Sequence, residues 1–303
     1  MDKVSVFLDT DIGDDIDDTW ALAFLLNCPE IKLEYALTCN SPAPYRAKLI
    51  AKILQWAGDT TTPIGFGIPT APKNIPMGFR KSQAAWIEDF ELKKVQNPIF
   101  ENGVEEFVKK IMDCPGTPVI VAIGPLVNIA RAIEIEPAIV PKSRIVIMGG
   151  SIRIGYSGKS TPSQEYNIAQ YPQAAQKVFS APWKDTLIVP LDTCGYIYLN
   201  GPDYQKICES DTPMAKAVTE NYFHWNHDAA RHFGQYSSLL CDTVAVYFAF
   251  EENNCVIENL PIRVTENGYT VIDEVNGRMC RAATGWKDFQ KFKGFLTQRL
   301  LQQ

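Results

Sequence analysis

The sequence lacks several features that mark large classes of protein. Its 303 residues contain only three histidines, and none of its eight cysteines forms a Cys-X-X-Cys pair. No apolar run reaches the roughly 18–20 residues that a bilayer-spanning helix needs. The net charge of −6 offers no basic surface to nucleic acid or to an anionic membrane. We therefore expect neither a nucleic-acid-binding protein nor a membrane protein.

The cysteines and the opening residues bear on the cellular compartment. Scattered thiols in a chain of this length indicate reduced cysteines rather than a disulfide framework, and they do not support a cysteine-ligated zinc site. The opening residues MDKVSVFLDTD enter a predicted strand without the apolar region and cleavage site of a signal peptide. The expected localisation is cytoplasmic.

Short apolar runs alternate with helical patterns through the first 200 residues. The predicted strands are 3–9, 31–39, 62–67, 117–124, 144–150 and 186–191. The predicted helices between them are 18–27, 45–58, 103–112, 126–133 and 172–179. This β-α alternation predicts an α/β fold with a mostly parallel central sheet and helices on both faces. Ligands of such sheets bind beyond the carboxyl ends of the strands.

The pattern becomes more helical beyond residue 200. Helices are predicted at 217–233 and 238–250, a short β segment at 261–283, and a last helix at 286–301. The chain has no repeat and no low-complexity linker. We therefore expect a single domain that spans residues 1–303.

An acidic stretch lies where the first strand gives way to the first helix. The segment DTDIGDDIDD (9–18) places six aspartates within ten positions. Helix capping explains one or two of them, at about 0.5–2 kcal/mol each, but not six. Carboxylates 4 Å apart repel by roughly 1–4 kcal/mol per pair. The aspartates therefore either splay into solvent or hold a hard divalent cation such as Ca²⁺ or Mg²⁺.

Three stretches resemble one known family. DTDIGDDIDD (9–18) is similar to the N-terminal signature of the inosine-uridine nucleoside hydrolases, an Asp-X-Asp-Pro-Gly-X-Asp-Asp run at the end of the first strand. VAIGPLVNIARA (121–132) resembles the family's Gly-Pro-Leu-Thr-Asn-Ile-Ala segment, and LLCDTVAVY (239–247) its late His-Asp block. With weaker matches between them, these stretches keep the family's order over residues 1–250. The resemblance implies hydrolysis of the N-glycosidic bond of a ribonucleoside or related ribosyl compound.

The resemblance also implies a metal site. One Ca²⁺ ion would be bound by Asp11, by both oxygens of Asp18, and by Asp242, which the fold would bring back to the acidic stretch. The backbone carbonyl of Ile123 would be a further ligand. Asp11 would also be the general base for a metal-bound water that attacks the anomeric carbon. Such a set of oxygen ligands suits Ca²⁺ and makes a bound water more acidic.

A second group of residues would hold the sugar. By resemblance, Asp17 would bind the ribose 2′-hydroxyl, and Asn40, Glu165 and Asn167 would contact ribose hydroxyls. The surrounding carboxylates would stabilise an oxocarbenium-like transition state. The alternative for Asn40 and Asn167 is an ordinary turn position, and the alternative for Glu165 is a surface carboxylate.

The acidic stretch departs from the family signature by two extra residues. We align the family's aspartate pair with Asp17 and Asp18, which leaves Asp15 as a rival metal ligand. Asp14 we interpret as solvated. Asp192, at another strand end, we interpret as structural.

The group that activates the leaving base is altered. Cys241 occupies the position where many members carry the histidine that protonates the base, and a thiol with a pKa of about 8.5 is a poor replacement. Cys241 is therefore either a small packing residue or a catalytic group. All three histidines lie in the aromatic segment 217–236, where Trp225, His227 and His232 are candidates for a wall against the base. An amphipathic core helix is the alternative.

Lys159 lies where an Asn is common in the family, six residues before Glu165. It is either a contact for the sugar 5′ position or part of an exposed loop.

Two other functions compete with nucleoside hydrolysis. Asp9-Thr10-Asp11 faintly resembles the aspartate pair of Mg²⁺-dependent haloacid-dehalogenase-like phosphatases. The chain could also bind a ribosyl ligand through Ca²⁺ without efficient turnover, because the leaving-group acid is altered. For the leading hypothesis, the resemblance implies a small-molecule nucleoside substrate and a homodimer or homotetramer.

Overall fold

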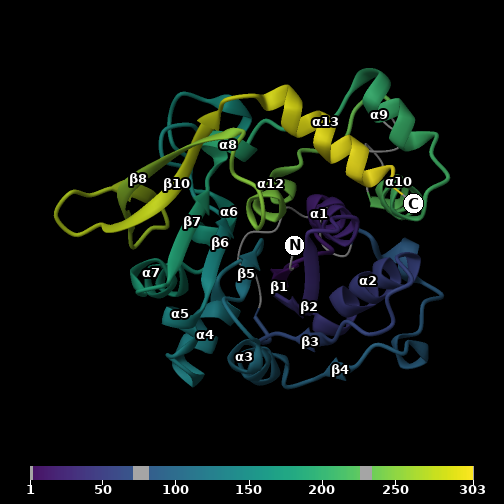
Figure 1. Ribbon diagram of the computed structural model, residues 1–303, viewed down its shortest axis with the longest axis horizontal. Coiled ribbons are helices and arrows are strands. Elements are labelled where there is room, and N and C mark those ends of the chain that lie inside the picture. The colour runs from purple at the N-terminus through teal and green to yellow at the C-terminus, as the bar shows by residue number, and fades with distance from the viewer. Residues whose placement is uncertain (1–2, 71–81, 226–233, 303) are drawn as a thin grey trace.

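The computed structural model describes residues 3–70, 82–225 and 234–302. Within these residues, ten strands form one sheet in the order β4-β3-β2-β1-β5-β6-β7-β10-β8-β9 (Figure 1). The strands from β4 to β10 in this order pair in parallel, whereas β8 and β9 are antiparallel. The fold class is the one predicted, an α/β fold with a mostly parallel sheet.

The strands are β1 (Val4–Thr10), β2 (Ile31–Thr38), β3 (Ile64–Phe66), β4 (Ile99–Phe100), β5 (Val119–Ala122), β6 (Arg144–Met148), β7 (Asp185–Val189), β8 (Cys255–Val264), β9 (Thr270–Ile272) and β10 (Arg278–Trp286). The α-helices are α1 (Asp17–Leu26), α2 (Ala43–Trp56), α3 (Gly103–Asp113), α4 (Val127–Ile135), α5 (Ile139–Lys142), α6 (Tyr166–Ala169), α7 (Pro172–Ser180), α8 (Leu191–Cys194), α9 (Gly201–Cys208), α10 (Pro213–Trp225), α12 (Cys241–Phe248) and α13 (Phe289–Leu300). Short 3₁₀ turns lie at Ala84–Ile87, Leu92–Lys94 and Tyr156–Gly158. Among the described helices, none is long and apolar enough to cross a membrane.

Helices cover both faces of the sheet, and each face has its own apolar core. Successive strand residues point to opposite faces, so Val6 and Leu8 of β1 join one core while Phe7 joins the other. Helices α1, α2, α12 and α13 lie on the first face, and α3, α4 and α7 lie on the second (Figure 1). Because both faces of the central strands are buried, these strands read as continuous apolar runs.

Helices α1 and α12 pack against each other on the first face. Every residue of α1 from Asp17 to Leu25 is buried, which explains why its sequence DDTWALAFLL has no polar side beyond its first turn. Its amino end follows directly from the carboxyl end of β1. The fold therefore buries most aspartates of the acidic stretch and places the start of α12 beside them.

Several element boundaries differ from the prediction. The last helix and the β segment are present as α13 and as β8 to β10, but β8 begins at Cys255 rather than 261. The helix predicted at 238–250 is α12, which begins only at Cys241. The helix predicted at 217–233 corresponds to α10, which begins at Pro213, and residues 226–233 of that prediction lie outside the described residues. The two-residue strand β4 and helix α9 were not predicted, because neither has a run long enough to show a period.

A network of four charged side chains ties three strands to the end of α12. Arg144 on β6 pairs with Asp185 at 3.0 Å and with Glu252 at 2.5 Å, and Arg281 on β10 pairs with the same two carboxylates. Arg144 Nη2 also donates to the carbonyl of Phe248, the last residue of α12, at 2.8 Å. The network therefore holds the carboxyl end of α12 against the sheet.

Replacing Arg144 with methionine should lower the free energy of unfolding by about 2–3 kcal/mol, because two half-buried carboxylates lose one of their two arginine partners and a helix carbonyl loses its donor. Arg131→Met is the matched control, since the Arg131–Glu134 pair is half exposed and should be worth less than about 1 kcal/mol. Urea denaturation of both variants measures the difference. Equal losses would show that the network does not stabilise the fold as described.

Candidate functional site

A cavity of about 350 Å³ opens at the carboxyl ends of the central strands. It lies where β1, β5 and β6 end, as the topology predicts for a parallel sheet. Its lining residues are Asp11, Asp14, Asp15, Ile16, Asp17, Asp18, Ile123, Met148, Tyr156, Glu165, Tyr166, Asn167, Trp225, Ser238, Leu239, Cys241 and Asp242. Nearly all candidate site residues that lie within the described part of the chain therefore share one cavity.

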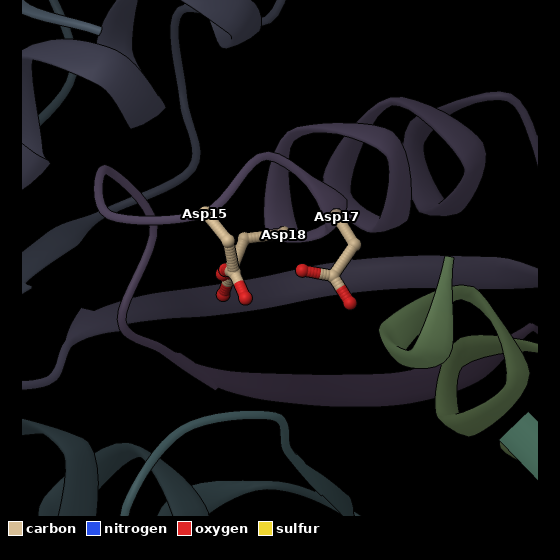
Figure 2. Close-up of side chains that lie close together, drawn as sticks. All are labelled: Asp15, Asp17 and Asp18. Carbon is tan, nitrogen blue, oxygen red and sulfur yellow. The ribbon is translucent and has the colours of Figure 1, made fainter. Parts of the chain in front are cut away.

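Three carboxylates of the acidic stretch form a compact cluster. Asp15, Asp17 and Asp18 each place an oxygen within 4.8 Å of the others, and Figure 2 shows their side chains at the start of α1. The Thr10 hydroxyl donates a hydrogen bond to Asp18, which fixes the direction of that carboxylate. Asp15 is exposed, whereas Asp17 and Asp18 are buried. The rival ligand Asp15 thus belongs to the same cluster as the aligned pair, Asp17 and Asp18.

The fold brings Asp242 to the same place from the far end of the chain. The backbone N–H of Asp242, in the first turn of α12, donates to Asp17 Oδ2 at 3.4 Å. Asp11 and Asp242 are 6% and 3% exposed, so both carboxylates are withdrawn from bulk water. A Cβ on Gly124 would lie 2.9 Å from Asp11 Oδ1, so only glycine lets the Gly-Pro-Leu segment approach Asp11 this closely.

Surrounding residues fix the backbone of the acidic stretch from outside. The buried Arg46 donates to the carbonyls of Asp11 and Ile12 and pairs with Asp14 at 2.6 Å. The next three backbone carbonyls also accept hydrogen bonds. The Tyr45 hydroxyl donates to the Gly13 carbonyl, and Gln83 Nε2 donates to the Asp15 carbonyl. The Asp14 carbonyl accepts from the Ser82 hydroxyl and from Trp225 Nε1. These bonds fix the backbone of the stretch, and five of its aspartates line the cavity.

Burial of so many carboxylates is electrostatically costly. Burial raises the pKa of Asp11, Asp17, Asp18 and Asp242 well above the ordinary range, and the charges of neighbouring aspartates raise it further. The Arg46 charge only partly offsets this for Asp11 and Asp18. The site is therefore short of positive charge, and its donors are all oxygens. This donor set fits a hard divalent cation.

Glu165 and Asn167 flank the start of α6. Glu165 accepts backbone N–H bonds from Gly150 and Asn167, each at 2.9 Å, and burial raises its pKa to about 7. Asn167 Nδ2 donates to the carbonyls of Ile123 and Met148 at 3.1 and 3.2 Å. Ile123 lines the cavity, and its carbonyl keeps a second lone pair beyond the bond from Asn167.

Asn40 and Lys159 lie less centrally. Asn40 does not line the cavity, but its side-chain amide donates to Asp11 Oδ2 at 3.4 Å. Lys159 is exposed and does not line the cavity, so the loop interpretation describes its placement. Asp192 accepts backbone N–H bonds from Ile152 and Arg153, each at 2.9 Å, which is the structural role expected for it.

The candidates for the wall against the base are only partly described. Trp225 lines the cavity and stacks on Tyr222 with ring centroids 6.0 Å apart. His227 and His232 lie outside the described residues. Cys241 lines the cavity, and its Sγ donates to the Cys194 carbonyl at 3.5 Å. Contact with the Cys194 side chain, burial and nearby carboxylates raise the pKa of the Cys241 thiol well above its ordinary value.

Sequence reasoning missed Arg46, Tyr156, Tyr166 and Ser238. Arg46 lies in an ordinary amphipathic helix pattern, and nothing in its neighbours signals a buried guanidinium. Tyr166 stands between Glu165 and Asn167, and this position was a usable signal. Tyr156 and Ser238 lie in irregular segments, where sequence periodicity gives no information about direction.

Comparison with known proteins agrees with this arrangement. The family model described as inosine-uridine preferring nucleoside hydrolase matches residues 6–293. The inosine-uridine preferring nucleoside hydrolase of Crithidia fasciculata is 29% identical over 321 residues, which cover 97% of this chain and 96% of that protein. A probable uridine nucleosidase 2 of Arabidopsis thaliana is 27% identical over 280 residues, 89% of this chain and 84% of that protein.

A solved structure shares the fold. The plant nucleoside hydrolase PpNRh1 aligns with a TM-score of 0.80 over 99% of both chains, at 21% identity. The family model spans nearly the whole described chain, including β1, the cavity and α12. The chain therefore belongs to the inosine-uridine preferring nucleoside hydrolase family, whose members hydrolyse the N-glycosidic bond of ribonucleosides.

Proposed function

We propose that the chain is a calcium-dependent N-ribohydrolase in which Asp11 is the general base. The observation that carries the proposal is the convergence of Asp11, Asp17 and Asp18, from the β1–α1 connection, with Asp242 of α12 on one cavity. The weaker hypothesis from the sequence, that the chain is a haloacid-dehalogenase-like phosphatase, is wrong, because the nucleoside hydrolase family model matches residues 6–293.

Asp11, Asp18, Asp242 and the carbonyl of Ile123 would hold the ion, and Asp15 is a further candidate ligand because it belongs to the compact carboxylate cluster. When bound, Ca²⁺ supplies the missing positive charge, orders sugar hydroxyls and makes a nearby water more acidic. The all-oxygen donor set and the raised pKa values of these aspartates support this assignment.

Asp11 accepts a proton from the attacking water. Asn40 orients its carboxylate by the hydrogen bond to Oδ2. The close approach of Gly124 leaves Asp11 little freedom to turn away. A base held in one orientation avoids the entropic cost of positioning it during the reaction.

Asp17, Glu165 and Asn167 bind the ribose hydroxyls. All three line the cavity, and both Glu165 and Asn167 are fixed by bonds to backbone groups. As the glycosidic bond stretches, positive charge develops on the sugar ring. The carboxylates around the ring stabilise that charge more than they stabilise the neutral substrate, which lowers the barrier.

The substrate class is a ribonucleoside. Relatives with related names include a probable uridine nucleosidase and a purine-preferring ribonucleoside hydrolase from Gardnerella vaginalis, so the fold accommodates both kinds of base. Trp225 offers an aromatic face on the wall of the cavity. We assign Cys241 to packing, since its thiol is engaged with the Cys194 carbonyl.

Asp11→Ala should reduce kcat on ribonucleosides by more than about 1,000-fold, because the base and a metal ligand disappear together. The matched control is Asp203→Ala, which removes an exposed carboxylate of α9 and should leave kcat unchanged. Release of reducing sugar measures both. Near-normal kcat for Asp11→Ala would refute its assignment.

Cys241→Ser should change kcat by less than about tenfold, or roughly 1.4 kcal/mol, since the thiol does not serve as an acid. The measurement is steady-state kinetics on a panel of ribonucleosides. A larger loss, with unchanged thermal stability, would assign the thiol a part in the chemistry.

A further inference from the structure

The proposed mechanism leaves the departing base without a partner. Cys241 occupies the position of the family's usual histidine, and its Sγ donates a hydrogen bond to the Cys194 carbonyl. A base that leaves with the bonding electron pair needs a hydrogen-bond donor or a proton. Such a donor should come from the cavity wall near Cys241.

Tyr156 meets this requirement by position. It lines the same cavity as Cys241 and Glu165. Its hydroxyl oxygen accepts the backbone N–H of Tyr166 at 2.9 Å, so the oxygen is fixed while its hydrogen is directed elsewhere. In the described part of the chain, no side chain or carbonyl accepts that hydrogen.

The segment that carries Tyr156 is firmly held. Asp192 accepts the N–H groups of Ile152 and Arg153 at its root, and the Gly155 N–H donates to the Lys159 carbonyl at 2.9 Å across the turn. Ser163 N–H donates to Ser151 Oγ at 2.8 Å and closes the loop. A donor fixed before the reaction stabilises developing charge without a reorganisation cost.

The electrostatic surroundings keep this phenol neutral. Burial and the charge of Glu165 raise the pKa of Tyr156 above its ordinary value, and Cys241 and Asp15 act in the same direction. A neutral phenol retains its hydrogen at physiological pH, so it remains a donor.

Tyr166 and Ser238 also line the cavity, and their buried hydroxyls have no hydrogen-bond partner among the described residues. Tyr156 lies in the 3₁₀ turn Tyr156–Gly158, which packs against α8. Helix α8 carries Cys194, whose carbonyl accepts the hydrogen bond from Cys241. Tyr156 is therefore on the side of the cavity from which the family's histidine acts.

We propose that the Tyr156 hydroxyl donates a hydrogen bond to the departing base and is a catalytic residue for leaving-group activation. The inference rests on the proposed function. When the C1′–N bond breaks, the base takes its electron pair, and the phenol stabilises the resulting charge. Water adds hydroxide to C1′ and gives its proton to Asp11. Asp11 then releases that proton to solvent, and the released base takes up one proton from solvent, so that one water is consumed overall and the enzyme is regenerated.

The test compares Tyr156→Phe with the parent enzyme on two substrates in the presence of Ca²⁺. Natural ribonucleosides need help to release the base, whereas p-nitrophenyl riboside releases a stable phenolate without a donor. The variant should lose about 10- to 100-fold in kcat on ribonucleosides and less than about threefold on p-nitrophenyl riboside. Tyr204→Phe, which removes a buried hydroxyl away from the cavity, should change neither rate.

The second substrate also reports on folding, because an intact site still cleaves p-nitrophenyl riboside. Equal losses on both substrates would make Tyr156 a structural residue and overturn the inference, as would no loss on either. A parent enzyme that cleaves only p-nitrophenyl riboside would show that no group activates the leaving base. A parent enzyme that cleaves neither substrate would overturn the proposed function itself.

Discussion

Repulsion among buried carboxylates is the constraint on which the site depends. Asp11, Asp17, Asp18 and Asp242 share one cavity, and burial together with their mutual charge raises the pKa of each. Arg46 is a buried guanidinium among them, yet its contacts go to backbone carbonyls and Asp14. The clustered carboxylates therefore favour positive charge in the cavity, which both a bound cation and a positively charged transition state can supply.

The fold creates this concentration of charge by simple means. The parallel sheet ends its central strands at one edge, and α1 begins there with two buried aspartates. Helix α12 packs beside α1, so Asp242 lies next to Asp17 although more than 200 residues separate the two in the sequence. The outer shell of Arg46, Tyr45, Gln83 and Trp225 then fixes the loop that connects strand to helix.

The fold class could be predicted because it depends on local patterns, and the β-α alternation predicted the sheet. The convergence of Asp11, Ile123 and Asp242 was expected only from the family resemblance of the stretches that carry them. The choice between Asp15 and Asp17 was not predictable, since two extra residues change the loop and only its three-dimensional contacts place each carboxylate. Tyr156 was missed for a related reason: its direction depends on a loop fixed by the distant Asp192.

The central claim is that one divalent cation relieves the repulsion among these aspartates. Calorimetric titration with Ca²⁺, repeated in buffers of different ionisation enthalpy, tests it most directly, because binding to carboxylates with raised pKa values must release protons. The account predicts uptake of one Ca²⁺ per chain, with proton release that is larger at pH 6 than at pH 8. Absence of Ca²⁺ uptake across this pH range would contradict it.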